Sequence, residues 1–166
     1  DHVNKRDNVL IDDVDAAMNR AVDNGVKNLV VQPTHLMHGL EYDELVKEVG
    51  NYADAFDQVV FGEPLLSSDD DFAKVEKAIT EWTAEYDDGK TAICFMGHGT
   101  EADSNEIYQK MQDLLTKDGY ANYFVGTVEA TPSLEDVLAK VQAGDYERVV
   151  LEPLMVVAGD HANNDM

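Results

Sequence analysis

The feature that most constrains the fold of this chain is a regular alternation of short apolar runs with longer stretches of helical apolar spacing. The short runs at residues 29–31, 59–61, 91–96, 123–128 and 148–151 are typical of buried strands. The stretches between them carry apolar residues at helical spacing. Strictly alternating strands and helices predict an α/β protein with parallel strands covered by helices on both faces.

Local signals predict where several helices begin and which faces they bury. A helix after Asp12 and Asp13 is expected to end near Gly25, and Ser133 with Asp136 resembles a capping box that opens another. The helical stripe between residues 72 and 86 contains Trp82. We expect this tryptophan to lie in the core rather than to form a platform for a cofactor.

A weak internal repeat predicts two related halves. Shifting the sequence by 120 positions places Pro33 on Pro153 and Gly39 on Gly159, and the preceding helices align without a gap. The strand at 91–96 has no counterpart in the first half, and the segment 41–61 has none after Met166. We therefore expect two similar α/β domains, both incomplete, with residues 1–88 as the C-terminal part of the first and 89–166 as the N-terminal part of the second.

The charge and composition exclude several classes of protein. The chain has 34 acidic and 12 basic residues, a net charge of −22, so it should repel nucleic acid and anionic membranes. We interpret the acidity as a solubilising surface rather than an electrostatic lure for cations. Cys94 is the single cysteine, which excludes disulfide frameworks and cysteine zinc sites. It lies in an apolar run and is expected to be buried.

No membrane span or signal peptide is visible in the sequence. No run approaches the ~20 apolar residues that cross a bilayer. We expect a cytoplasmic protein; an exported variant is left open because the sequence does not begin with Met.

Candidate site residues follow three strands of the second half. In a parallel α/β sheet, ligands bind beyond the carboxyl ends of the strands, and the first strong ligand-type residues there are His98, Glu129 and His161. Two imidazoles and a carboxylate suit borderline divalent metals such as cobalt, nickel, iron or zinc, and they can also accept protons. Gly97 and Gly99 would leave room for a ligand beside His98. The alternative is that both histidines are ordinary loop residues satisfied by backbone groups.

The first half has polar residues at similar positions. His35, His38 and Glu41 follow one predicted strand, and Glu63 follows the next. These residues could line the opposite wall of a cleft, although ordinary loop roles explain them equally well, above all for His38. The sequence contains no Gly-x-Gly-x-x-Gly or Walker loop and no Gly-x-Ser-x-Gly elbow, which argues against nucleotide binding and an α/β-hydrolase.

Four segments carry a family resemblance. Residues 95–101 read Phe-Met-Gly-His-Gly-Thr-Glu, 125–129 read Val-Gly-Thr-Val-Glu, and 153–166 read Pro-Leu-Met-Val-Val-Ala-Gly-Asp-His-Ala-Asn-Asn-Asp-Met. Residues 30–35 read Val-Val-Gln-Pro-Thr-His and precede Gly39, Glu41 and Tyr42. In order and spacing these segments resemble the anaerobic sirohydrochlorin cobaltochelatases, over essentially the whole chain.

The resemblance implies a fold, a reaction and a site. The fold would be two similar α/β domains of the chelatase type that ferrochelatases share, with the tetrapyrrole in the cleft between them. The reaction would insert Co(II), the substrate metal, into sirohydrochlorin in cobalamin biosynthesis and release two pyrrole N–H protons. The family's metal site maps onto His98, Glu129 and His161, and we expect His98 to accept protons. His35, Glu41, Gly97 and Gly99 are the residues expected to contact the tetrapyrrole.

The resemblance leaves some matters open. We expect no organic cofactor and no nucleic-acid or membrane partner; a homo-oligomer is left open. The sequence lacks the family's opening strand and the segment after its Asn-Asn-Asp-Met motif, so we expect it to be unstable or inactive unless neighbouring chains cover the exposed edges. The alternatives are a protein of the same fold that binds a tetrapyrrole, haem or a metal without turnover, as some exported relatives bind haem, and a chelatase for nickel or iron.

Overall fold

The computed structural model describes residues 2–157, with side chains from residue 5 onward. These residues form two compact units, one comprising residues 2–33 and 40–63 and the other comprising residues 34–39 and 64–157. Each unit has its own parallel sheet, so the predicted α/β class is confirmed. The domain boundary predicted between residues 88 and 89 stays a prediction.

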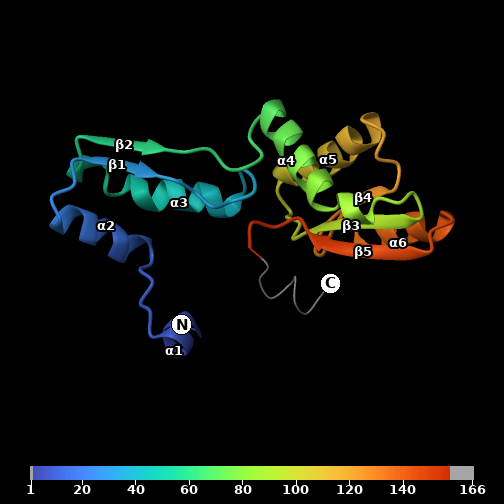
Figure 1. Ribbon diagram of the computed structural model, residues 1–166. Helices are drawn as coiled ribbons and strands as arrows, with labels where there is room; N and C mark the ends of the chain where they lie inside the picture. Colours follow the sequence, from blue (N-terminus) through green and yellow to red (C-terminus); the bar gives the residue numbers. More distant parts are fainter. Residues whose placement is uncertain (1, 158–166) are drawn as a thin grey trace. The chain divides into compact units, whose positions relative to one another are not determined.

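The first unit is built on a pair of parallel strands. Its elements are, in order, α1 (His2–Asp7), α2 (Val14–Asp23), β1 (Asn28–Val31), α3 (Leu40–Gly50), the 3₁₀ turn η1 (Ala53–Ala55) and β2 (Gln58–Phe61). The strands β1 and β2 pair with Leu29 opposite Val59 and Val31 opposite Phe61 (Figure 1).

One face of this two-stranded sheet packs against helices. Its core consists of Met18 from α2, Val49 from α3 and Phe56, and the inward residues of β1 and β2 pack against them. On the other face Val30 is 71% exposed and Val60 is 43% exposed. The alternation of inward and outward side chains along each strand explains this division. Within the described residues, helices therefore cover one face of the sheet, where the sequence predicted cover on both.

The second unit contains a three-stranded parallel sheet in the order β4-β3-β5. Its elements are α4 (Asp69–Trp82), η2 (Ala84–Tyr86), β3 (Thr91–Gly97), η3 (Asp103–Asn105), α5 (Glu106–Lys117), β4 (Tyr123–Thr127), α6 (Leu134–Ala143) and β5 (Arg148–Pro153). The strands predicted at 91–96, 123–128 and 148–151 are confirmed, and the last continues through Pro153, as its sequence indicated.

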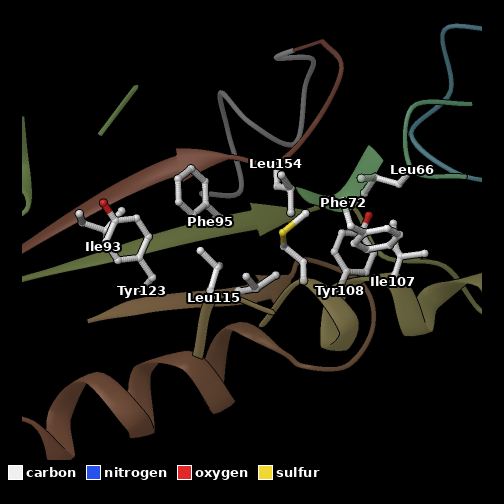
Figure 2. Packing of buried hydrophobic residues seen from close by; sticks show 11 residues of the cluster. Leu66, Phe72, Ile93, Phe95, Ile107, Tyr108, Leu115, Tyr123 and Leu154 are labelled. Atoms are coloured by element: carbon white, nitrogen blue, oxygen red, sulfur yellow. The ribbon is translucent and has the colours of Figure 1, made fainter. Parts of the chain in front are cut away.

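Strand β3 is the centre of the second unit, because all seven of its residues are buried. Its alternate side chains point to opposite faces. One face joins the larger core, in which Phe95 and Tyr123 lie against side chains from α4 and α5 (Figure 2). The other face, including Cys94, packs against Val137 of α6. The predicted burial of Cys94 is confirmed.

The two halves of the internal repeat begin with matching elements. Helix α2 (Val14–Asp23) and helix α6 (Leu134–Ala143) each have ten residues, and their bounds differ by 120 at both ends. The following strands begin at Asn28 and Arg148, again 120 apart. The Ser133 capping box is present as predicted. This correspondence of elements agrees with the two related halves that the sequence predicted.

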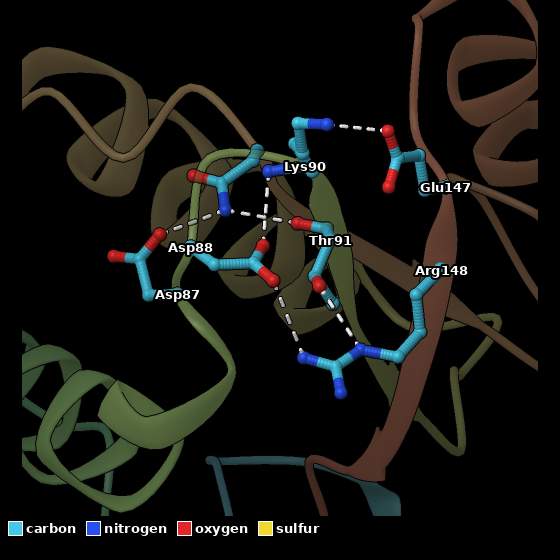
Figure 3. A network of polar contacts seen from close by, with 7 residues as sticks. Asp87, Asp88, Lys90, Thr91, Glu147 and Arg148 are labelled. Atoms are coloured by element: carbon cyan, nitrogen blue, oxygen red, sulfur yellow. Dashed lines mark hydrogen bonds and ion pairs between the residues drawn. The ribbon is translucent and has the colours of Figure 1, made fainter.

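The amino end of the second sheet is held by polar contacts. Arg148 donates from Nε to Thr91 Oγ1 at 3.0 Å, and its guanidinium lies 3.6 Å from Asp88 (Figure 3). Lys90 pairs with Glu147 beside them. These contacts join β3 to β5 at the edge where both strands begin, so the opposite edge, where the strands end, is available for a site.

One sequence expectation is wrong. Trp82 is 71% exposed, whereas the sequence placed it in the core. Helix α4 ends at Trp82, and the next residue, Thr83, is fully buried and donates to Ile79 O at 2.8 Å. Successive helical residues point about 100° apart, so burying Thr83 turns Trp82 away from the core.

Within residues 2–157, none of the helices combines the length and apolarity that a membrane crossing requires.

Candidate functional site

The register of β3 and β4 brings His98 and Glu129 to the same point. Gly97, the last residue of β3, pairs with Thr127, the last residue of β4. The ladder continues past the strands, because Val128 N donates to Gly97 O at 3.0 Å and Glu129 N donates to His98 O at 2.9 Å. The first residues beyond both strands therefore lie side by side, as the carboxyl-edge argument predicted.

The imidazole of His98 has a defined orientation. Its Nδ1 lies 2.8 Å from the carbonyl oxygen of Gly99. A carbonyl oxygen only accepts hydrogen bonds, so Nδ1 carries the proton and the neutral ring keeps a lone pair on Nε2. Nε2 lies 3.6 Å from Oε2 of Glu129. The two side chains are 47% and 54% exposed, so solutes can reach them from solvent.

This spacing suits a shared cation. The 3.6 Å between Nε2 of His98 and Oε2 of Glu129 is longer than a hydrogen bond. Two atoms that bind one divalent ion at about 2.0–2.2 Å in tetrahedral geometry lie about 3.4 Å apart. Nε2 of His98 and Oε2 of Glu129 both carry lone pairs. A metal cation between these two atoms, or a proton on the imidazole, would stabilise this arrangement. The arrangement can therefore bind a metal or accept a proton.

Hydrogen bonds fix the loop after β4, which carries Glu129. Thr127 uses its Oγ1 to donate to Pro132 O at 3.0 Å and to accept from Ala130 N at 3.1 Å. Asn105 joins this loop to the one after β3. Its Oδ1 accepts from Thr100 N at 3.1 Å and its Nδ2 donates to Thr131 O at 2.6 Å. These bonds hold the backbone on both sides of Glu129.

The two glycines beside His98 are required by close contacts. A Cβ at Gly97 would overlap the ring of Tyr108. Gly99 has φ +90°, a left-handed conformation, and a Cβ there would lie 2.8 Å from Ala130. The contacts with protein explain why glycine is needed at both positions. The role in ligand approach that the sequence suggested for them stays a prediction.

The third predicted ligand is His161. Strand β5 ends at the same edge as β3, since Leu154 N donates to Met96 O at 2.8 Å. His161 follows β5 in the sequence but lies outside the described residues. Among residues 2–157, no three His, Cys, Asp or Glu side chains converge closely enough to hold a metal ion. His98 and Glu129 lie beside each other, and the ligand role predicted for all three residues stays a prediction.

The first-half candidates lie in different elements. His35 and His38 belong to the segment Thr34–Gly39 of the second unit. The carbonyl of His35 accepts from Leu65 N at 3.1 Å, and His38 Nε2 lies 3.4 Å from Ser67 Oγ. Glu41 lies in the first turn of α3, in the other unit. Their predicted role in contacting a tetrapyrrole stays a prediction.

Sequence reasoning missed the residues that support the pair. Asn105, Thr127 and Tyr108 hold the two loops, yet none follows a strand as an obvious ligand. For Tyr108 a signal existed, because it shares helical spacing with the buried residues Met111 and Leu115. For Asn105 the sequence offered no local signal, since its partners Thr100 and Thr131 belong to two different loops.

Comparison with known proteins decides the family. The profile of the CbiK cobalt chelatase family matches residues 1–166. The chain belongs to the CbiK cobalt chelatase family. The family resemblance read from the sequence is thus confirmed.

Two curated relatives are similar to this CbiK family member. It is 30% identical over 162 residues to the "Sirohydrochlorin cobaltochelatase" of Salmonella typhimurium, covering 98% of the chain and 61% of the relative. It is 30% identical over 142 residues to the "Sirohydrochlorin cobaltochelatase CbiKC" of Nitratidesulfovibrio vulgaris, covering 84% of the chain and 50% of the relative. This CbiK family member spans about half to three-fifths of the length of these relatives.

Proposed function

We propose that this chain belongs to a sirohydrochlorin cobaltochelatase, a lyase that inserts Co(II) into sirohydrochlorin. The substrate metal and the tetrapyrrole are proposed from the names of the two relatives and the family. The observation that carries the proposal is the pair His98 and Glu129, with Nε2 and Oε2 3.6 Å apart beyond the ends of two parallel strands. We propose His161 as the third ligand from its place in the sequence.

Metal insertion needs a group that holds the ion and a group that accepts pyrrole protons. His98 suits both tasks, because the hydrogen bond from Nδ1 to Gly99 O leaves Nε2 as the basic atom. When Nε2 takes a proton, the imidazolium faces the carboxylate of Glu129 and is stabilised by it. The same carboxylate offsets part of the charge of a divalent ion. A neutral imidazole and a carboxylate suit cobalt, and they also suit nickel and iron.

Further parts of the proposal depend on the resemblance. His35, Glu41, Gly97 and Gly99 are proposed to contact the tetrapyrrole. No organic cofactor is needed for the exchange of two protons for one metal ion. We propose that the protein works in the cytoplasm.

The experiment is Co(II) insertion into sirohydrochlorin, followed by visible absorption, with the protein at its natural length. Replacing a general base lowers rates by about 10²–10⁴-fold, so we expect His98→Ala and Glu129→Gln each to slow insertion at least 100-fold. His161→Ala should behave in the same way. Glu135→Gln is the matched control, because Glu135 is an exposed carboxylate in the first turn of α6 and its loss should change the rate less than twofold.

Other outcomes would contradict the proposal in distinct ways. A folded wild-type protein that binds Co(II) or haem without insertion would indicate a binding protein of the same fold. Faster insertion of nickel or iron than of cobalt would indicate a different metal substrate. An equal loss in Glu129→Gln and Glu135→Gln would remove Glu129 from the site.

A further inference from the structure

Tyr108 lies directly beneath the loop that carries His98. It lies in the first turn of α5, on the buried side of the helix, and is 1% exposed. Its ring fills the space that a side chain at Gly97 would need, and it packs in the larger core of the second unit (Figure 2). A large polar side chain therefore lies against the backbone on one side of the candidate site.

The hydroxyl of Tyr108 contacts the peptide group that joins His98 to Gly99. Gly99 N donates to Tyr108 Oη at 3.4 Å. Burial raises the pKa of Tyr108, and hydrogen bonds from the backbone of Gly99 and His98 partly oppose that rise. The phenol is thus neutral at physiological pH, and its oxygen accepts hydrogen bonds from the loop.

The same peptide group is held from its other side by Glu129. Its carbonyl, that of His98, accepts from Glu129 N at 2.9 Å, while its N–H, that of Gly99, donates to Tyr108. Gly99 then provides the carbonyl that accepts from Nδ1 of His98 at 2.8 Å. Two hydrogen bonds, one at the N–H and one at the carbonyl of Gly99, therefore link Tyr108 to the imidazole through the backbone of Gly99.

We propose that Tyr108 is a positioning residue that fixes the His98–Gly99 peptide and so aims Nε2 of His98 at the divalent cation shared with Glu129. Partners of this kind orient a ligand without touching the metal, and their loss commonly weakens metal binding about 10–100-fold. The inference depends on the proposed function for its meaning in metal insertion. Its prediction about cation binding can be tested without turnover.

Tyr123 provides a matched control. It is also 1% exposed, and its hydroxyl also makes a buried hydrogen bond, 3.1 Å from Thr83 Oγ1. Tyr123 begins β4, at the end of the strand opposite to Glu129. Tyr123→Phe therefore removes a similar hydroxyl from a similar environment at the far edge of the sheet.

The test compares Tyr108→Phe and Tyr123→Phe in the protein at its natural length. Co(II) affinity is measured by competition titration, and the Co(II) visible absorption reports the ligand geometry. We expect both variants to lower the melting temperature by similar amounts. Only Tyr108→Phe should weaken Co(II) binding, by at least 10-fold, and change the absorption spectrum. In insertion assays it should lower kcat with little change in the KM for the tetrapyrrole.

Several results would overturn the inference. It fails if Tyr108→Phe binds Co(II) with the affinity and spectrum of the wild type, or if Tyr123→Phe is weakened equally. If Tyr108→Phe does not fold, the inference is tested in the wild type by measuring the hydrogen-exchange rate of the Gly99 amide by NMR. Exchange at the rate of an unprotected amide would show that Tyr108 does not hold it. A wild type that binds Co(II) without inserting it would overturn the proposed function and leave the binding result standing.

Discussion

At the scale of single residues, burial changes the chemistry of side chains that the site does not use. Cys94 is 2% exposed in the middle of β3, on the face that packs against α6. Burial raises the pKa of its thiol from 9.0 to about 11. Because the thiolate is the reactive form, this cysteine should be inert at neutral pH.

We predict slow alkylation of Cys94 in the folded protein. At pH 8 about one thiol in a thousand is ionised when the pKa is about 11, so iodoacetamide should react at least 100-fold more slowly than after unfolding in urea. The rate should rise about tenfold per pH unit up to about pH 10, because the raised pKa keeps most of the thiol protonated through this range. Mass spectrometry reports the single cysteine directly. Equal rates in the folded and unfolded protein would contradict the burial.

The two site residues were identifiable individually. His98 and Glu129 follow predicted strands, and the structure brings them together because β3 and β4 pair in register. The direction of the imidazole was not predictable from sequence. It depends on the hydrogen bond to Gly99 O, which requires the left-handed backbone of Gly99.

At the scale of elements, the start of α6 was predicted correctly from the local sequence, whereas the face that α4 buries was not. The capping box of α6 is complete, with Ser133 Oγ accepting from Asp136 N at 3.2 Å and Asp136 Oδ2 accepting from Ser133 N at 2.8 Å. The buried face of α4 differed from the prediction, since Thr83 rather than Trp82 is buried at its end. Local hydrogen bonds within four residues determine a cap, whereas a buried face depends on what packs against it.

We predict that Ser133→Ala lowers the free energy of unfolding by about 1 kcal/mol, because the first turn of α6 loses its cap. Urea unfolding measures the change. Ser104→Ala is the matched control, since the Ser104 hydroxyl is buried with no hydrogen-bond partner among the described residues. Its removal should change the stability by less than about 0.5 kcal/mol or increase it. Equal losses in both variants would show that the capping bonds contribute nothing.

At the scale of the whole molecule, the core of the first unit shares no buried residue with the clusters of the second unit among the described residues. Met18 lies in the core of the first unit and Met111 in the larger core of the second, 5% and 0% exposed. The segment Thr34–Gly39 belongs to the second unit although the residues on either side of it belong to the first. A local loss of packing should therefore remain within one unit.

We predict reciprocal effects of Met18→Ala and Met111→Ala on amide hydrogen exchange. Each substitution leaves a cavity that costs about 2–5 kcal/mol. Met18→Ala should speed exchange in β1 and β2 and leave β3 and β4 protected, and Met111→Ala should do the reverse. The two variants serve as controls for each other. Faster exchange throughout the chain in both would show that the units unfold together.

The class of the fold, the positions of the strands, the start of α6 and the two candidate residues beyond the strands could be predicted from the sequence alone. These follow from chain geometry, because apolar periodicity and capping act between residues a few positions apart. The strand order β4-β3-β5, the exposure of Trp82 and the contact of Tyr108 with Gly99 became known from the three-dimensional structure. These depend on which distant surfaces pack together, and the free energy of that packing belongs to pairs of elements rather than to any local stretch of sequence.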